Sequence, residues 1–371
     1  MTTSAVGTRK GAFIVTREHR RFVEFAKAGF RVTGYDKDPV KVRKFNEGDS
    51  YIEDIPSTVL GPLVKEGRGL VLTDRLAAKL GVPEAQIAIG NGSNELLDLL
   101  IRTFSVPGDE ILGPAHTFLC YKLSALAHGA TFTEVPRGPG FAYDIDAIVD
   151  AVTPRTRIVF LANPDNPTGV YADRAAMERL LRRLPERVLL CVDEAYTEFA
   201  TAEDFPDCIA MRDLRETLVV LRTFSKIYGL AGLRCGYAVA PAAVVNYLDR
   251  VRTPFNVNSI AQAAATAALD DEAHVRRSQA LVREGMAQVA AGLSRIGVLH
   301  APSQGNFVLV DVAPTGGRAL FGAMLRHGVI VRPMNGYGLP HHVRVTIGTP
   351  DENRRFLDAL EATVVAARAG V

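Results

Sequence analysis

Lys226 has the sequence surroundings of a reactive amine. It stands in the segment TFSKIYGLAGLRCGY, directly after the apolar run at residues 218–221, with Thr223 and Ser225 before it and Arg234 eight residues later. Partial burial and nearby cations lower the pKa of a lysine, so its neutral amine can form a Schiff base. The two hydroxyls and the arginine suit a phosphate group. An ordinary surface lysine in a polar loop is the alternative.

Two further runs of apolar residues end in polar groups. Asp193 follows the run at residues 188–192, and α/β proteins bind ligands at the carboxyl ends of parallel strands. A buried carboxylate there would keep a pyridine nitrogen protonated and make the ring an electron sink. Asn166 lies in the turn NPDNPTG after the run at residues 158–162, and its amide could donate to a phenolic oxygen. The alternatives are a helix-capping Asp and a plain tight turn.

Two weaker signals lie earlier in the chain. Ser93 and Asn94 belong to the turn IGNGSNE, which opens an apolar helix. Free backbone N–H groups at a helix start bind phosphate, although Ser93 could instead serve only as an N-cap. Phe118 stands at a strand-to-helix junction in PAHTFLCY. An aromatic ring at that place could stack on a planar cofactor or simply belong to the core.

The elements around these residues alternate between short apolar strands and amphipathic helices. The runs IVFLA (158–162), VLLCV (188–192) and LVVL (218–221) have the length of buried parallel strands, and a helical pattern covers residues 174–184. This alternation predicts an α/β fold with a parallel sheet covered by helices. In the C-terminal part, the sequence pattern predicts helices at Ser259–Leu269 and Glu272–Ile296. It then predicts a strand at 306–312, a helix at 317–327, two short strands and a closing helix at 351–368.

Composition excludes several classes of protein. The 371 residues carry 43 Lys and Arg against 41 Asp and Glu, so there is no polybasic field for nucleic acid or anionic lipid. The N-terminus has charges where a signal peptide needs an apolar stretch, and no apolar run approaches the roughly 18 residues of a membrane span. Four cysteines lack CxxC spacing, and the two adjacent histidines 341 and 342 lack the spacing of metal ligands. We expect a cytoplasmic enzyme that acts on a small molecule without a metal.

In their order and spacing these segments resemble the fold-type-I pyridoxal phosphate aminotransferases. The likeness covers about residues 74–368 and is carried by NPDNPTGVY, VDEAYTEF, TFSKIYGLAGLRCGY, PFNVNSIAQAAA and RPMNGYGLPHHVRVTIGT. Within that family the motifs are most similar to those of the histidinol-phosphate aminotransferases. The resemblance implies a large, mostly parallel sheet domain at 74–250, a smaller α+β domain at 251–371, and a homodimer. It also implies pyridoxal 5'-phosphate as cofactor, with an amino donor and 2-oxoglutarate as substrates.

The resemblance also implies roles for the residues that match the motifs. Lys226 would form the Schiff base with the cofactor, and Asp193 would pair with its ring nitrogen. Tyr196 and Asn166 would both bond to the phenolic oxygen of the ring, on which Phe118 would stack. The cofactor phosphate would be held by a group of polar residues, namely Ser93, Asn94, Thr223, Ser225 and Arg234.

Two arginines are implied as substrate contacts. Arg344, in RVTIGT, would bind a substrate carboxylate, and Arg332, in VRPM, is a candidate partner for a substrate phosphate. The resemblance therefore predicts transamination of histidinol phosphate in histidine biosynthesis. An aromatic-amino-acid aminotransferase would share every cofactor motif. A carboxylate substrate needs Arg344, whereas a phosphate needs further cations near Arg332, and the sequence leaves this choice open.

Residues 1–73 depart from the family pattern. The family opens with an arm similar to SxNENPxG and a YPD-type segment, and neither stands here. Residues 25–74 are instead similar to a piece of a nucleotide-sugar dehydrogenase, with Asp36 at the position of a ribose-binding carboxylate. The GxGxxG turn is replaced by IVTREHRRFV, so we expect no NAD binding. We interpret the segment as a structural replacement or fusion remnant, which leaves a catalytically impaired protein that binds pyridoxal phosphate as a further alternative.

Overall fold

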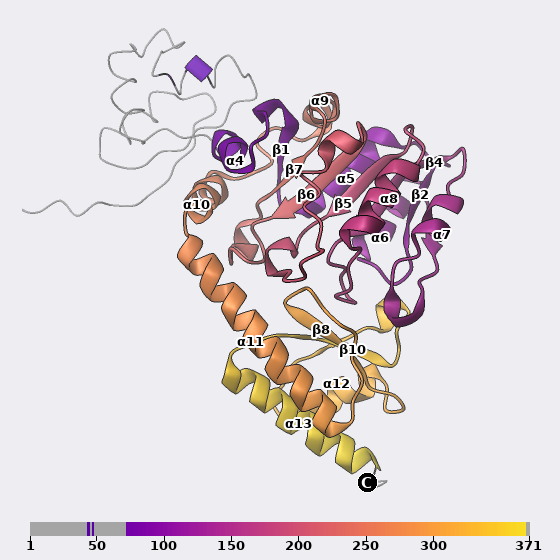
Figure 1. Ribbon diagram of the computed structural model, residues 1–371, viewed down its shortest axis with the longest axis vertical. Coiled ribbons are helices and arrows are strands. Elements are labelled where there is room, and N and C mark those ends of the chain that lie inside the picture. Colours follow the sequence, from indigo (N-terminus) through magenta and orange to yellow (C-terminus); the bar gives the residue numbers. More distant parts are fainter. Residues whose placement is uncertain (1–42, 45–46, 48–71, 369–371) are drawn as a thin grey trace, which may run out of the picture. The chain divides into compact units, whose positions relative to one another are not determined.

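The computed structural model describes residues 43, 44, 47 and 72–368 (Figure 1). These residues belong to two compact units. Unit 1 contains the described residues up to Leu96 together with Thr223–Glu272, and unit 2 contains Leu97–Arg222 and the residues from Ala273 onward. Most of residues 25–74, for which the sequence analysis predicted a likeness to a dehydrogenase, lies outside the described residues. The interpretation of residues 1–73 and the domain boundaries after residues 73 and 250 therefore stay predictions.

A parallel sheet forms the centre of unit 2. Its strand order is β6-β5-β4-β2-β3, and every neighbouring pair in this order is parallel. All residues of β5 and nearly all of β4 are buried, which explains why both read as continuous apolar runs. The predicted strands and their parallel arrangement are confirmed. The strands are β2 (Glu110–Pro114), β3 (Thr131–Val135), β4 (Thr156–Ala162), β5 (Leu189–Asp193) and β6 (Leu218–Thr223).

Helices connect most of the parallel strands of unit 2, because a parallel pair needs a crossover connection (Figure 1). Helix α8 (Arg174–Arg183) shows how the sequence fixes one of them. Asp173 caps it by accepting the Ala176 N–H at 2.7 Å, and its inner face buries three apolar side chains. The other connecting helices are α6 (Cys120–Ala127) and α7 (Ile145–Asp150), whereas α5 (Ser93–Phe104) precedes β2.

Unit 1 contains an antiparallel pair of strands. Strands β1 (Ile87–Gly90) and β7 (Gly236–Val239) pair antiparallel along their whole length. The sequence patterns did not predict this direction. Helix α4 (Leu72–Leu80) packs on α10 (Ser259–Leu269), where Lys79 Nζ donates to the Leu269 carbonyl at 2.7 Å. Helix α9 (Ala242–Val251) also belongs to this unit.

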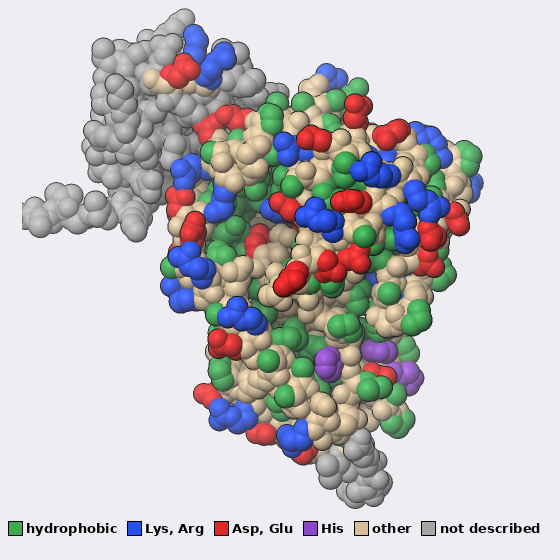
Figure 2. All heavy atoms as spheres, viewed as in Figure 1, with side chains coloured by type: hydrophobic (Ala, Val, Ile, Leu, Met, Phe, Trp, Pro, Cys, Tyr) green, Lys and Arg blue, Asp and Glu red, His purple; other side chains and the backbone are tan. Residues whose placement is uncertain are grey.

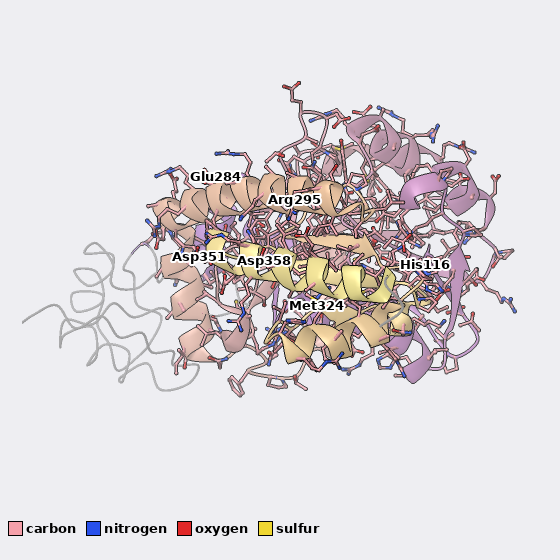
Figure 3. All side chains as sticks on the ribbon, turned by 90° about the horizontal axis from the view of Figure 1, so that it is seen from below. His116, Glu284, Arg295, Met324, Asp351 and Asp358 are labelled. Carbon is pink, nitrogen blue, oxygen red and sulfur yellow. The ribbon has the colours of Figure 1, made fainter. Side chains whose placement is uncertain are left out.

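The C-terminal part of unit 2 is an α+β arrangement. Strands β8 (Phe307–Asp311), β10 (His342–Thr346) and β9 (Arg332–Pro333) form an antiparallel sheet in that order. Figure 3 shows α11 (Glu272–Ile296) beside α13 (Pro350–Arg368), where Arg295 pairs with Glu361 at 2.9 Å. Helix α12 (Gly317–Arg326) adds Leu320 and Met324 to their shared core. Predicted and observed bounds of these elements differ by at most one residue at either end.

The surface carries charges of both signs. On the face drawn in Figure 2, Lys and Arg side chains are interspersed with Asp and Glu. Among the described residues, no helix is long and apolar enough to cross a membrane. In the same part of the chain, no cluster of three or more His, Cys, Asp or Glu could hold a metal ion.

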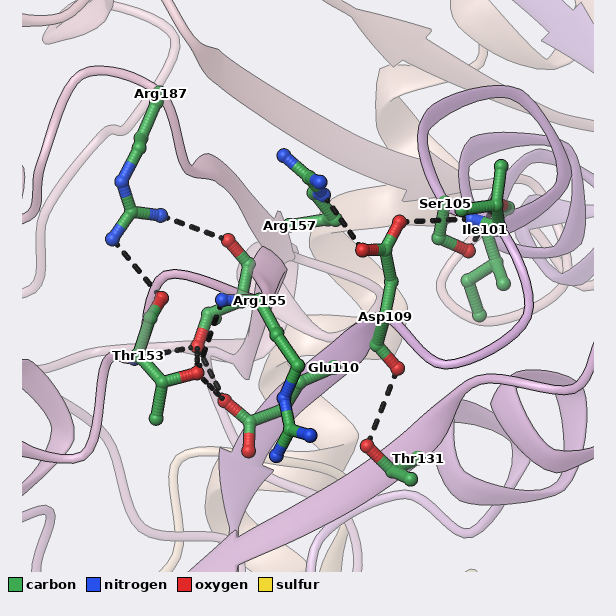
Figure 4. Close-up of polar contacts among 11 residues, drawn as sticks. Ile101, Ser105, Asp109, Glu110, Thr131, Thr153, Arg155, Arg157 and Arg187 are labelled. Atoms are coloured by element: carbon green, nitrogen blue, oxygen red, sulfur yellow. Dashed lines mark hydrogen bonds and ion pairs between the residues drawn. The ribbon is translucent and has the colours of Figure 1, made fainter.

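A polar network lies at the amino ends of β2 and β4, the sheet edge away from the residues singled out above (Figure 4). The buried Glu110 carboxylate accepts hydrogen bonds from Thr133 at 2.7 Å, from Thr153 at 3.0 Å and from Thr156. Burial alone would raise the pKa of Glu110, but these hydroxyls and the nearby Arg155 bring it below its usual value. The ionised carboxylate therefore stabilises the folded state.

We predict that Glu110→Ala lowers the free energy of unfolding by about 2 kcal/mol, because the hydroxyls of the buried Thr156 and the part-buried Thr133 and Thr153 lose their acceptor. Chemical denaturation at pH 7 measures this. The exposed Glu203 supplies the control, and Glu203→Ala should stay within about 0.5 kcal/mol of the parent protein. Because the pKa of Glu110 is lowered in the folded protein, its contribution should fade as the pH falls below 4.5. Equal destabilisation at pH 7 and pH 3 would contradict this account.

Candidate active site

The turn after β4 is built around the buried carboxylate of Asp165. This side chain is 0% exposed and accepts hydrogen bonds from the hydroxyls of Thr117 and Thr168, each at 2.6 Å. It also pairs with Nη2 of Arg137 at 2.9 Å, and the arginine side chain is itself buried. Thr117 follows β2 and Arg137 follows β3, so one carboxylate joins the loops at the carboxyl ends of three neighbouring strands.

Asn166 is held by the turn that Asp165 anchors. Its Oδ1 accepts a hydrogen bond from Nη1 of Arg344, which belongs to β10. An amide whose oxygen is engaged in this way turns its NH2 group to act as a donor elsewhere. Gly169 closes the turn at φ +80°, and a Cβ there would lie 2.2 Å from Oγ of Ser303, so the close approach requires glycine.

Asp193 ends β5 and is 6% exposed. Its Oδ2 accepts a hydrogen bond from the Tyr121 hydroxyl at 2.8 Å, and its Oδ1 accepts the Ala195 N–H at 3.2 Å. Tyr121 is fully buried and lies edge-on to Phe118, with ring centroids 5.5 Å apart. The structure therefore brings Asp193 and Phe118 to the same tyrosine, at the carboxyl end of the sheet.

Tyr196 and Arg344 meet at a common ring. Tyr196 packs edge-on against Phe307 at 5.0 Å, and the Arg344 guanidinium lies 5.1 Å from the centre of the same phenylalanine ring. Such cation–π contact supports a guanidinium that is partly removed from water. Arg332 on β9 stands directly opposite Arg344 in the register of the antiparallel pair.

Lys226 lies in the loop after β6, in unit 1. Its carbonyl accepts the Gly229 N–H at 2.9 Å, and Thr223 Oγ1 accepts the Ser225 N–H at 3.1 Å. Nη1 of Arg234 reaches Oγ of Ser225 at 3.4 Å and the Ala231 carbonyl at 3.0 Å. The loop thus gathers two hydroxyl residues and a guanidinium within a few residues of the amine.

The Arg234 guanidinium also packs on the turn that opens α5. A Cβ on Gly92 would lie 2.4 Å from Nη2 of Arg234, so this turn accepts the arginine only because it has a glycine there. Ser93 is the first residue of α5 and Asn94 the second. Backbone N–H groups at a helix start and a guanidinium beside them are the donors that a phosphate prefers.

The residues predicted from the sequence thus fall into two sets. The set in unit 1 has the character of a phosphate site with an amine, and its members are Ser93, Asn94, Thr223, Ser225, Lys226 and Arg234. The set in unit 2 has aromatic, carboxylate and amide groups with two arginines, and its members are Phe118, Asn166, Asp193, Tyr196, Arg332 and Arg344.

Sequence reasoning missed four residues that support the set in unit 2. They are Thr117, Tyr121, Arg137 and Asp165. A usable signal existed for Arg137, which stands in VPRGPGF just after β3, where a charged side chain faces the binding edge of a parallel sheet. Asp165 could have been singled out as the acid inside a turn of prolines and asparagines. Nothing local marks Tyr121 as different from a core aromatic.

Known proteins are similar to most of this chain. A family model, aminotransferase class I and II, matches residues 70–360. The chain belongs to the class I and II aminotransferases. It is 50% identical over 298 residues to the histidinol-phosphate aminotransferase of Anaeromyxobacter sp. strain Fw109-5, covering 80% of this chain and 82% of the relative. It is 45% identical over 299 residues to histidinol-phosphate aminotransferase 1 of Nitrosococcus oceani, covering 81% and 80%.

Solved structures of aminotransferases have a similar fold. The crystal structure of histidinol-phosphate aminotransferase from Sinorhizobium meliloti in complex with pyridoxal-5'-phosphate matches with a TM-score of 0.73 at 28% identity, covering 80% of this chain and 81% of that one. The predicted fold class, a fold-type-I α/β transferase, is confirmed. The chain is a pyridoxal 5'-phosphate-dependent aminotransferase.

The residues present fit this cofactor. In unit 1, the approach of Arg234 to Gly92, beside Ser225, creates a cationic cradle at a helix start, which suits a phosphate. In unit 2, Asp193 is a buried carboxylate with oriented hydrogen bonds, which suits a protonated ring nitrogen.

Glu198 is a part-buried carboxyl two residues after Tyr196. It lies in the short 3-10 helix Thr197–Phe199, and its carbonyl accepts Nε2 of Gln279 at 2.6 Å. Burial raises the pKa of the Glu198 carboxyl from 4.5 to about 7, against the opposing effect of Arg222. A raised carboxyl pKa means that the folded state binds the proton more tightly than the unfolded state.

We predict that Glu198→Gln raises the melting temperature relative to the parent at pH 8 and changes it little at pH 4.5. The contribution of protonated Glu198 is complete below pH 4.5 and is lost as the pH rises through about 7. Melting curves between pH 4.5 and 8 measure this. The exposed Glu216 provides the control, since Glu216→Gln should follow the parent at every pH. A Glu198 variant that parallels the parent over the range would show that this group does not titrate there.

Proposed function

We propose that this aminotransferase transfers the amino group between histidinol phosphate and 2-oxoglutarate. The observation that carries the choice of substrate is the position of Arg332 on β9 directly opposite Arg344 on β10. Residues directly opposite in an antiparallel pair have Cβ atoms about 5 Å apart on one face, and like charges there are destabilising. A phosphate group would neutralise both guanidiniums. The names of the relatives at 45–50% identity support the same substrate.

The cofactor and the residues of the chain would have separate roles in the reaction. Pyridoxal phosphate supplies, when bound, a ring that accepts the electron pair left at the substrate α-carbon. In this proposal, the guanidinium of Arg234 and the start of α5 bind the phosphate. The Asp193 carboxylate holds a proton on the ring nitrogen, and the Asn166 amide and Tyr196 hydroxyl donate to the phenolic oxygen. The neutral amine of Lys226 removes the α-proton.

An aromatic-amino-acid aminotransferase is the second candidate. The observation in its favour is that Arg344 already contacts Asn166 and Phe307, an arrangement that also suits a substrate carboxylate. Such an enzyme would use the same cofactor residues but would have no role for Arg332 in binding. The two functions therefore differ in what Arg332 does.

We predict that the full-length holoenzyme transfers the amino group of histidinol phosphate at least tenfold more efficiently, in kcat/KM, than that of phenylalanine or tyrosine. Arg332→Gln should lower kcat/KM for histidinol phosphate about 10- to 100-fold, the loss of a charge-assisted hydrogen bond, and leave the aromatic amino acids unchanged. Coupled 2-oxoglutarate assays measure this. Preference for tyrosine, or equal losses on all substrates, would overturn the assignment.

Lys226 offers the matched control for these assays. It is the only lysine after Lys122, so no neighbouring lysine in the second half of the sequence can take its place. Lys226→Ala should abolish transamination of every substrate. Borohydride reduction of the parent holoenzyme followed by peptide mapping should place the pyridoxyl group on Lys226. A label on Lys122 would contradict the role given to Lys226.

We infer a homodimer from the surface of unit 1. Phe255 and Ile260, in the segment PFNVNSI, are 67% and 63% exposed in the single chain. Large apolar side chains gathered in this way are typical of a surface that another subunit covers. Light scattering at micromolar concentration should give twice the 40.1 kDa of one chain, and Phe255→Asp should shift the mass toward one chain. A monomer with full activity would refute the inference.

We also propose that the enzyme works in the cytoplasm. All four cysteines are free, which suits a reducing compartment. Recovery of the active enzyme from a periplasmic or membrane fraction would contradict this location.

A further inference from the structure

We propose that Tyr121 is a positioning residue for the cofactor ring, because it holds the carboxylate of Asp193 and the ring of Phe118 in one fixed arrangement. The inference rests on the proposed role of Asp193 as the partner of the ring nitrogen. Tyr121 does not touch the reacting atoms in this proposal. It acts through the two side chains that do contact the cofactor.

The first observation is the hydrogen bond. Oη of Tyr121 donates to Oδ2 of Asp193 at 2.8 Å, and both side chains are buried. A carboxylate in the interior needs donors, and a hydroxyl supplies one without adding charge. Burial and the charge of Asp193 raise the pKa of the Tyr121 phenol well above its usual value, so the proton stays on the tyrosine. Tyr121 is therefore the donor of this hydrogen bond and Asp193 the acceptor.

The second observation is that the tyrosine itself has little freedom to move. Its ring stacks on Phe160 of β4 with centroids 4.7 Å apart and planes 6° from parallel. Tyr121 lies in the first turn of α6, and its N–H donates to the Phe118 carbonyl at 3.1 Å. The strand below and the helix turn around it fix the direction of the hydroxyl.

The third observation is that Tyr121 also contacts Phe118, the residue assigned to stack on the cofactor ring. Phe118 meets Tyr121 edge-on, with centroids 5.5 Å apart and planes at 85°. Edge-to-face pairs of this kind have a preferred geometry, so a shift of Tyr121 would also move the phenylalanine. One side chain thus sets both the group assigned to the ring nitrogen and the ring assigned to its face.

The consequence for the reaction follows from charge. The Tyr121 hydrogen bond draws part of the negative charge of Asp193 away from the cofactor and keeps the carboxylate plane fixed. Without it, the carboxylate is more negative toward the cofactor and less well oriented. Protonated forms of the bound cofactor then persist to higher pH, while the geometry needed for fast transfer is lost.

Tyr121→Phe tests this in the full-length holoenzyme, since it removes the hydroxyl and keeps the stacked ring. We expect amino transfer to slow about tenfold, the effect of losing a hydrogen bond to a charged group, with KM for the amino donor unchanged. The pH midpoint of the absorbance change of the bound cofactor should move to higher pH. A midpoint identical to that of the parent would overturn the proposal, whatever the rate.

Tyr171 provides a matched control. Its hydroxyl donates to Oδ1 of Asp204 at 2.7 Å, which is the same hydroxyl-to-carboxylate bond near the surface. Tyr171→Phe should leave the absorbance midpoint and the rate at their parental values. A midpoint shift of the same size in both variants would show a general effect of lost tyrosine hydroxyls and would also overturn the proposal.

A double-mutant cycle separates positioning from packing. In an Asp193→Ala background, Tyr121→Phe should change neither the midpoint nor the rate by more than about twofold, because the group through which it acts is gone. Equal effects in both backgrounds would mean that Tyr121 serves only the core. If Asp193→Ala itself leaves the midpoint and transamination unchanged, the role given to Asp193 under the proposed function fails. If only Tyr121→Phe is silent, that role stands and the present inference fails.

Discussion

The ion pair of Asp165 with Arg137 inside unit 2 is the constraint that fixes the positions of Asn166 and Phe118. The carboxylate at the end of β4 collects the guanidinium that follows β3 and the Thr117 hydroxyl that follows β2. Removing one partner of such a buried pair costs about 3–5 kcal/mol, because the other charge stays in the interior without compensation. The three loops are therefore fixed together. Asn166 and Phe118 are each the next residue after a member of this cluster, so their positions follow from it.

The turn that contains Asn166 also contacts the C-terminal sheet. Arg344 donates to Asn166, while Phe307 on the neighbouring strand β8 supports the guanidinium and meets Tyr196 edge-on. An amide that accepts from Arg344 presents its NH2 group as a donor, which agrees with the donation to a phenolic oxygen in the proposed function. Under the proposed function, Asn166 would therefore orient both the cofactor and the substrate-binding Arg344.

Much of the architecture could be predicted from local patterns, and the supporting contacts could not. The strands β4, β5 and β6 and the helices α8 and α10 to α13 were predicted to within two residues, because buried strands and amphipathic helices repeat apolar residues at their own periods. The positions of Lys226 and Asp193 after strands were also readable. By contrast, Thr117 and Asp165 are 48 residues apart and Tyr121 and Asp193 are 72 apart. Pairs so distant leave no periodic signal, and the antiparallel direction of β1 and β7 escaped for the same reason.

The two opposed arginines show where substrate choice would be encoded under the proposed function. Arg344 has an amide acceptor and an aromatic ring beside it, so its charge is accommodated before any substrate arrives. Arg332 stands opposite and is exposed, so water supports it when the site is empty. Bringing an anion between them removes the repulsion and replaces the lost water at Arg332 with a charge-assisted hydrogen bond. A substrate without a second anionic group would gain only what Arg344 offers. Discrimination by a phosphate would therefore come from Arg332, whereas Arg344 would contribute to the binding of every anionic substrate.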